Sequence, residues 1–280
     1  MSVFKAKLTV CTAAANPILA TQSLFDASYK EAKGSAIDEF LTRLQAINRL
    51  APTPSNFDPF QGQLVMLGVV AAVESFVRTL FRRTILIDPI CKDCVNEHPV
   101  SYGAATLLDR ELLPEALLEG MTFISKKNIE DALKSLMSIK GPTPPALERA
   151  ITDYVRVCQL RHCAVHRFGK LGVRNAIALG LADHSKLLEK PLRFDYAALQ
   201  NMIAISTGFV KTLNNLVFNE LLSRIPDTEW TGDYRTDKTL FRQYYYLFAD
   251  SVSVTRTIRP KALYLEFLEQ RKNWAAGRPF

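Results

Sequence analysis

The stretch from Gln61 to Leu86, QGQLVMLGVVAAVESFVRTLFRRTIL, decides the fold class of this protein. Its centre, Leu64 to Val73, is apolar on every side, which is typical of a helix buried in the middle of a bundle. We therefore expect a central helix over residues 61–86, and Asp88-Pro89 predicts where it ends. The continuous apolar run is too short to span a bilayer, so the sequence predicts no membrane as a partner.

Outward from this stretch, apolar residues recur at helical spacing along most of the chain, and almost no segment alternates like a strand. The pattern predicts an all-α fold. The other expected helices cover residues 17–50 with a break at Gly34-Ser35, 105–118, 125–139, 144–168, 195–225 and one or two parts of 239–280. The expected irregular connections cover residues 51–59, 91–102 and 226–238.

Helix-end signals are clearest around residues 144–168. Thr143 is a good capping residue, Pro144 suits the first helical position, and Phe168-Gly169 predicts the end. The 280 residues, of which 48% are hydrophobic, are enough for a sizeable core. We expect three parts: an N-terminal helical segment of residues 1–60, a helical core of residues 61–225 and a C-terminal extension of residues 226–280.

The net charge of +7 and the pI of about 9.1 favour an acidic partner, with nucleic acid ahead of an anionic membrane. Much of the excess lies in one segment. Its six basic residues stand against one acidic residue, Asp153, and are Arg149, Arg156, Arg161, Arg167, Lys170 and Arg174. Six minus one leaves five positive charges in a short stretch, which indicates a site for a polyanion such as RNA.

The five cysteines are an odd number in a long chain, so they fit reduced thiols in a cytoplasm better than a disulfide framework. The N-terminus imitates a signal peptide, since Lys5 and Lys7 precede an apolar stretch. Asn16-Pro17 interrupts that stretch. We therefore expect a cytoplasmic protein.

The segment from Gln159 to Gly169, QLRHCAVHRFG, carries the residues best suited to chemistry. It places the permanently charged guanidinium of Arg161 and the titratable imidazole of His166 near a helix end. Cleavage of RNA by transesterification uses these two kinds of group. An imidazole takes the proton of the ribose 2′-OH, and a fixed cation stabilises the charge that grows on the phosphate. Such a reaction needs no metal ion or other cofactor.

The run from Arg161 to His166, RHCAVH, resembles the motif of the HEPN superfamily, in which an Arg followed by a polar residue precedes a His. Val73 to Arg78, VESFVR, also looks like an early helix of several HEPN families. The resemblance covers residues 61–225 and implies a HEPN-type helical bundle with additional N- and C-terminal helices. It further implies a homodimer, endonucleolytic cleavage of RNA, and the role of a toxin or antiviral defence effector with an antitoxin or regulatory partner.

The resemblance gives each motif residue a role. His166 is the general base or acid, Arg161 holds the phosphate, and His162 tunes or orients the other two. Residues five apart on an ideal helix point about 140° apart, so Arg161 and His166 diverge. They converge only if the helix ends between them or if a second subunit contributes.

Four further residues complete the predicted site. Glu74 lies on the central helix, where it either forms a structural ion pair with Arg78 or reaches the cleft and orients Arg161 or His166. Three cations of the basic segment are expected to bind RNA, namely Arg156, Arg167 and Lys170.

Other interpretations remain open at this point. Cys91, Cys94 and His98 have zinc-like spacing, and Cys158, His162 and His166 stand four apart on one helical face. The aromatic run over residues 241–248 either stacks bases or belongs to the core. The rival to the enzyme is a non-catalytic HEPN-like module that dimerises or scaffolds a larger complex.

Overall fold

The computed structural model describes residues 3–12, 14–31, 34–253 and 258–279. In these ranges the chain forms twelve α-helices and four short 3-10 helices, and no strand pairing beyond an isolated bridge between Lys170 and Pro191. The all-α prediction is confirmed. The chain divides into two compact units, Met1–Lys33 and Gly34–Phe280, and these twelve α-helices all belong to the second.

The described part of Met1–Lys33 contains one regular element, the 3-10 helix Thr21–Leu24. The helix expected over residues 17–33 is therefore wrong for the residues described. Large apolar side chains of this stretch are almost fully exposed: Ile18 is 98% and Phe25 is 80% exposed. Exposed apolar side chains gain little from burial, which a short helix needs to offset its unfavourable nucleation.

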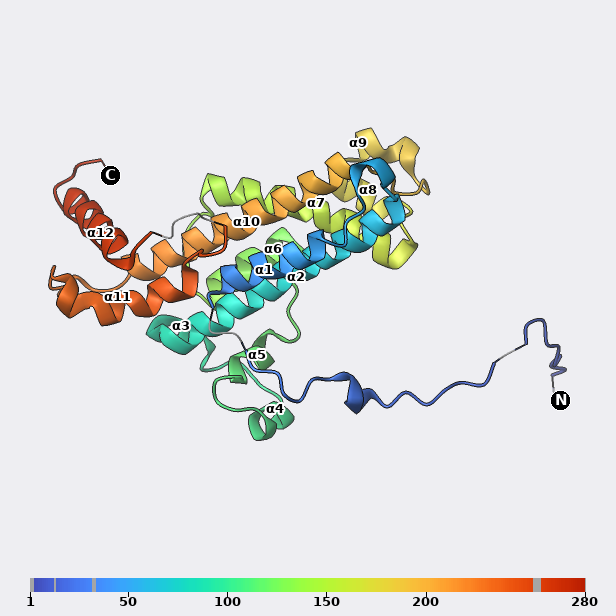
Figure 1. The fold of residues 1–280 in the computed structure, drawn as a ribbon, viewed down its shortest axis with the longest axis horizontal. Helices are drawn as coiled ribbons and strands as arrows, with labels where there is room; N and C mark the ends of the chain where they lie inside the picture. The colour runs from blue at the N-terminus through green and yellow to red at the C-terminus, as the bar shows by residue number, and fades with distance from the viewer. Residues whose placement is uncertain (1–2, 13, 32–33, 254–257, 280) are drawn as a thin grey trace. The chain divides into compact units, whose positions relative to one another are not determined.

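Helix α2, Pro59–Ile87, is the central helix of the second unit (Figure 1). Pro59 occupies its first position, and the side chain of Asp58 accepts the amide hydrogen of Phe60 at 2.9 Å. The predicted central helix is confirmed. By length and composition α2 is able to cross a membrane, but 61% of its apolar window is buried inside the protein, as in the core helix of a bundle.

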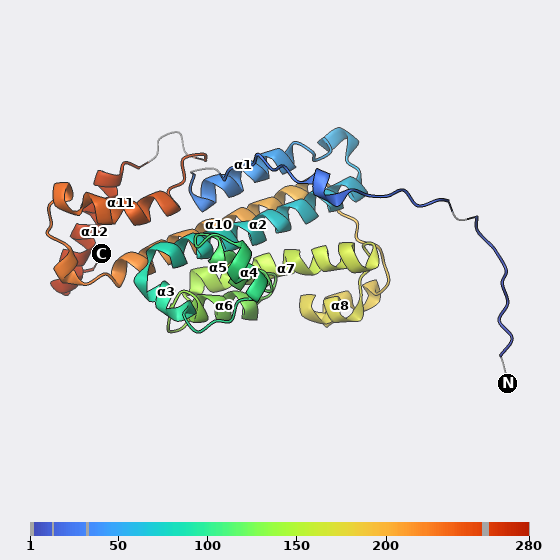
Figure 2. The same ribbon diagram turned by 90° about the horizontal axis from the view of Figure 1, so that it is seen from below.

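Three long helices pack against α2, namely α1 (Ala36–Asn48), α7 (Pro145–Arg167) and α10 (Tyr196–Ser223). Figures 1 and 2 show these helices running beside α2 along the second unit. Helices α2 and α10 both contact α7, which carries the RHCAVH motif. The two long apolar helices, α2 and α10, therefore both pack against the motif helix.

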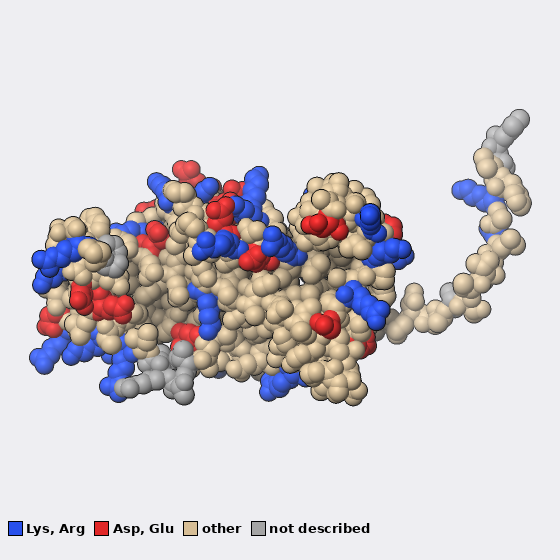
Figure 3. Space-filling view, turned by 90° about the horizontal axis from the view of Figure 1, so that it is seen from above, with Lys and Arg blue, Asp and Glu red and all other residues tan. Residues whose placement is uncertain are grey.

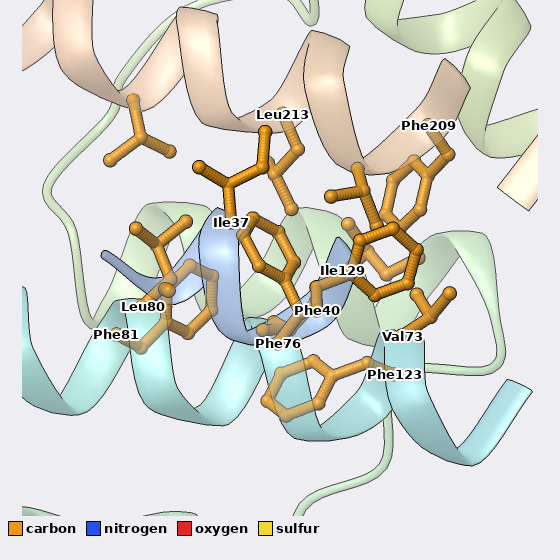
Figure 4. Packing of buried hydrophobic residues seen from close by; sticks show 14 of the residues in the cluster. Ile37, Phe40, Val73, Phe76, Leu80, Phe81, Phe123, Ile129, Phe209 and Leu213 are labelled. Atoms are coloured by element: carbon orange, nitrogen blue, oxygen red, sulfur yellow. The ribbon is translucent and has the colours of Figure 1, made fainter. Parts of the chain in front are cut away.

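Aromatic and aliphatic side chains from these helices fill one core (Figure 4). The rings of Phe40 on α1 and Phe76 on α2 lie 5.9 Å apart, and Tyr154 of α7 stacks on Phe209 of α10 at 4.6 Å. Burying each such side chain contributes roughly 1.5–3 kcal/mol relative to leaving it exposed. This packing sets the rotation of α7 and therefore which of its residues face solvent.

Four shorter helices follow α2: α3 (Pro89–Val95), α4 (Tyr102–Leu107), α5 (Leu113–Leu118) and α6 (Lys126–Ser135). The irregular connection expected over residues 91–102 is wrong for 91–95, which lie in α3. Asp88 ends α2, and its side chain accepts the amide hydrogen of Cys91 at 2.9 Å, so one Asp-Pro pair stops a helix and starts the next. The single helix expected near residues 105–118 is two, α4 and α5.

The start of α7 differs from the prediction. The helix begins at Pro145, with Pro144 at the cap position and no side chain capping the first turn. The hydroxyl of Thr143 instead donates a hydrogen bond to the Glu130 carboxylate on α6 at 3.1 Å. The predicted Thr143 cap is wrong because a tertiary partner takes its side chain.

The remaining helices are α8 (Val173–Leu179), α9 (Leu181–His184), α11 (Tyr234–Phe248) and α12 (Pro260–Ala275), with short 3-10 helices at Pro54–Asn56, Ser185–Leu187 and Asp227–Glu229. Of the tyrosines in the aromatic run, Tyr244 and Tyr245 are buried and Tyr246 is 58% exposed. The run therefore belongs mainly to the core where α11 packs on α10 and α12.

Candidate active site on helix α7

Helix α7 is continuous from Pro145 to Arg167, so Arg161, His162 and His166 all lie on it. It ends at Phe168, which adopts the left-handed conformation with φ of 50°, and the amide of Gly169 donates to the Cys163 carbonyl at 3.0 Å. The predicted end at Phe168-Gly169 is confirmed. The option that the helix ends between Arg161 and His166 is wrong, so within one chain these two side chains diverge by about 140°.

His162 and His166 form a pair on one face of α7. Their ring centres lie 4.5 Å apart and the planes are tilted by 47°. His166 is exposed and His162 is half-buried. Burial lowers the pKa of His162, and the nearby His166, Arg174 and Arg161 lower it further. His162 is therefore neutral at pH 7 and carries a lone pair that accepts a proton or binds an electrophile.

Arg161 is half-buried, and its guanidinium makes no hydrogen bond or ion pair with any residue that the structure describes. Burial raises the pKa values of Tyr154 and Cys158, two turns and one turn earlier, and the charge of Arg161 offsets part of that rise. The same charge contributes to lowering the pKa of His162, after burial, His166 and Arg174. Around the axis of α7, the buried Cys158 lies between Arg161 and the two imidazoles. A fixed, unpaired cation in this position is available to an anionic ligand.

The structural ion pair predicted between Glu74 and Arg78 is wrong for the described part of the chain. Arg78 donates to the backbone carbonyls of Leu118 and Met121, while Glu74 accepts the amide hydrogen of Phe123 at 3.2 Å. Both side chains therefore hold the loop between α5 and α6.

The charge of Glu74 also reaches helix α7. It raises the pKa values of Tyr154 and Cys158, the two groups on which Arg161 acts in the opposite direction. Glu74 therefore lies beside the same part of α7 as Arg161, without an ion pair between them within 4.0 Å among the residues described.

Two of the three predicted RNA-binding cations are held in surface ion pairs. Arg156 pairs with Asp153 at 3.0 Å and Arg167 with Glu189 at 2.6 Å, whereas Lys170 is exposed. Surface pairs of this kind contribute only about 0–1 kcal/mol, so a phosphate can displace the carboxylate. On the face shown in Figure 3, basic and acidic side chains are interspersed over the second unit.

Arg174 joins the candidate site although the sequence alone marks it only as one of several basic residues. Helix α8 packs beside α7, and Asn175 donates to the Gln159 side chain at 2.9 Å. This contact brings the charge of Arg174 to His162. The sequence marks the basic segment as a whole. The packing of α8 against α7 then places Arg174, among the cations of that segment, near His162.

Neither of the three-ligand metal sets considered from spacing is assembled. Cys91 is buried in α3, where Arg224 donates to its sulfur at 3.0 Å and burial raises its pKa to about 12. Burial also raises the pKa of Cys158 to about 12, so both remain protonated thiols. Across the described ranges, no group of three or more His, Cys, Asp or Glu side chains is placed to hold a metal ion.

A cavity of about 370 Å³ lies elsewhere, lined by residues of α1, α10 and α11 that include Lys211, Asn214 and Tyr245. None of the predicted site residues lines it. The cluster on α7 lies outside this cavity, and within the cluster His166 is exposed while Arg161 and His162 are half-buried.

The chain matches no protein-family model, and neither a curated protein nor a solved structure is significantly similar to it. The resemblance to the HEPN superfamily therefore depends on the motif residues themselves.

Proposed function

We propose that this protein is a metal-independent endoribonuclease of the HEPN type, acting in the cytoplasm as a toxin or antiviral defence effector. The observation that carries the proposal is an exposed His166 imidazole, paired with His162, on the same turns of a basic helix as a guanidinium, Arg161, that has no partner among the described residues. These are the groups that transesterification of RNA needs.

In the proposed reaction, His166 takes the proton of the ribose 2′-OH. The freed oxygen attacks the adjacent phosphorus, and the bond to the 5′ oxygen of the next nucleotide breaks. That leaving oxygen takes a proton from an imidazolium, either His166 of the same chain or the partner's His166. Arg161 donates to the phosphate oxygens as negative charge grows on them, and His162 keeps the neighbouring imidazole in position.

The proposal includes a homodimer. On a continuous helix, Arg161 and His166 point about 140° apart, so one phosphate reaches both kinds of group only where two chains meet. Exposed apolar side chains flank the site and suit such contact: Phe168 is 79% and Val165 is 45% exposed, and the Phe168 ring lies 5.5 Å from that of Phe60. A two-fold arrangement is the commonest one for identical chains.

The decisive experiment incubates the purified protein with total RNA in EDTA. We expect cleavage, with fragments that end in a 2′,3′-cyclic phosphate and begin with a 5′-hydroxyl. A matched RNA with 2′-deoxyribose at the cleaved position should stay intact, because it lacks the nucleophile. If RNA stays intact with the wild-type protein under all conditions, including with the natural regulatory partner added, the proposal of an enzyme is overturned.

The second candidate is a non-catalytic dimerisation or scaffold module. The exposed rings of Phe168 and Phe60 favour it, because exposed apolar side chains gathered in one place suit a protein–protein interface. The two candidates separate by mutation. Phe168→Ser should weaken self-association in both candidates. Replacing Arg161 or His166 removes RNA cleavage from the enzyme, whereas it leaves the self-association of a scaffold unchanged.

A further inference from the structure

The two imidazole rings of α7 are close enough to share one metal ion. His162 and His166 stand one turn apart, and their ring centres are 4.5 Å apart. Two histidines at this helical spacing are a recurrent pair of ligands for a transition-metal ion. The other two histidines, His98 and His184, have no such neighbour among the described ring contacts.

The separation of the ring centres is compatible with a shared ion. A metal about 2.1 Å from one nitrogen of each ring lies roughly 3.2 Å from each ring centre. Two such centres are about 4.5 Å apart when the angle between the two metal–nitrogen bonds is about 90°. An angle near this value suits tetragonal and octahedral ions such as Cu²⁺ and Ni²⁺ better than tetrahedral zinc.

The protonation of the pair also favours a metal. A metal ion binds the neutral imidazole, and burial together with His166, Arg174 and Arg161 lowers the pKa of His162. The same cations, Arg161 and Arg174, repel a divalent ion and weaken its binding. With two protein ligands the ion keeps several positions for water, so we expect reversible rather than structural binding.

We propose that His162 and His166 form a two-ligand site for a divalent transition-metal ion, and that its occupancy inhibits the protein. The inhibition rests on the ribonuclease proposed above, because the metal takes the lone pair that removes the 2′-OH proton. The site itself does not depend on that activity. Hard cations such as Mg²⁺, which prefer oxygen ligands, should not compete.

Binding is tested by calorimetric titration of untagged, metal-free protein with NiCl₂ or CuCl₂ at pH 7.5. We expect at most one ion per chain, with Cu²⁺ tighter than Ni²⁺ and no heat from MgCl₂. His162→Ala and His166→Ala should each weaken binding by at least about tenfold, since one of two ligands is gone. His98→Ala and His184→Ala are the matched controls, and binding that either control abolishes, or that both site variants retain, overturns the site.

The regulatory half is tested in the RNA assay. Adding NiCl₂ to the metal-free enzyme should stop cleavage, and excess EDTA should restore it. If the wild type never cleaves RNA but binds nickel through His162 and His166, the proposed function fails while the metal site stands. If it cleaves RNA and shows no histidine-dependent binding, the metal site fails while the function stands. Cleavage that continues at saturating nickel overturns the inhibition.

Discussion

Two arginines near helix ends have opposite surroundings. At the end of α10, Arg224 donates to the carboxylate of Asp88, to the sulfur of Cys91 and to the carbonyl of Met137. At the end of α7, Arg161 has no hydrogen-bond or ion-pair partner among the described residues. The guanidinium of Arg224 is enclosed by the protein's own acceptors, whereas that of Arg161 keeps its N–H donors available for an external anion.

The enclosed cluster ties four parts of the chain together. Asp88 is 2% exposed, caps α3 and accepts a hydrogen bond from the hydroxyl of Tyr244 on α11 at 3.2 Å. Burial raises the pKa of Tyr244, so its hydroxyl remains a donor. A buried group with partners supplied on several sides is a structural joint, whereas an accessible unpaired charge is available for binding. The comparison predicts that removing one arginine damages stability and removing the other damages activity.

The largest expected effect is on RNA cleavage. Arg161→Ala should lower the rate on the order of a hundredfold or more, and His166→Ala by roughly a hundred- to ten-thousandfold. His162→Ala should lower it less, because in the proposed reaction His162 orients the other groups and transfers no proton. Single-turnover cleavage of a labelled RNA measures these rates, with His98→Ala as the control. Equal cleavage by wild type and the first two variants would contradict the site.

The next effect is on folding. Arg224→Ala should lower the free energy of unfolding by about 3–5 kcal/mol, because it strands the buried carboxylate of Asp88. Urea unfolding followed by far-UV circular dichroism measures the loss. Arg161→Ala is the matched control and should change stability by less than about 1 kcal/mol. If both variants lose the same stability, the contrast between the clusters fails.

A smaller effect is the pH dependence of stability. The folded-state pKa of His162 lies below that of the unfolded chain, so below about pH 6.5 the unfolded chain binds the proton more readily. The unfolding free energy should therefore fall as the pH drops through this range, and His162→Gln should remove part of that fall. Urea midpoints at pH 7.5 and 5.5 give the comparison. His184→Gln serves as control, and an unchanged pH dependence in His162→Gln would contradict the shift.

The smallest effect concerns a surface pair. Arg156 and Asp153 are both substantially exposed, with side chains 66% and 49% accessible. Arg156→Ala should change stability by less than about 1 kcal/mol while reducing the salt dependence of RNA binding, because one phosphate contact is lost. Filter binding of a non-cleavable RNA across salt concentrations tests this. If Arg156→Ala lowers the stability as much as Arg224→Ala does, the contrast between exposed and enclosed arginines is contradicted.

Local signals in the sequence determined the long helices of this protein. A segment that is apolar all round is stable only inside a bundle, so α2 was expected over 61–86 and lies at Pro59–Ile87. Helix α10 was expected over 195–225 and lies at Tyr196–Ser223. The same periodicity placed His162 and His166 on one face of α7, because that depends only on the helical repeat.

Only the tertiary structure decided the partners of the polar side chains. Thr143, Glu74 and Arg78 each have a short-range role that the sequence suggests, yet each bonds instead to a segment brought close by folding. Arg174 reaches His162 because α8 folds back onto α7. The helical pattern is not realised over the described residues 17–31, whose large apolar side chains Ile18 and Phe25 are exposed. Hydrogen-bond and charge partners are chosen by distance in space, which one-dimensional spacing encodes only within a few helical turns.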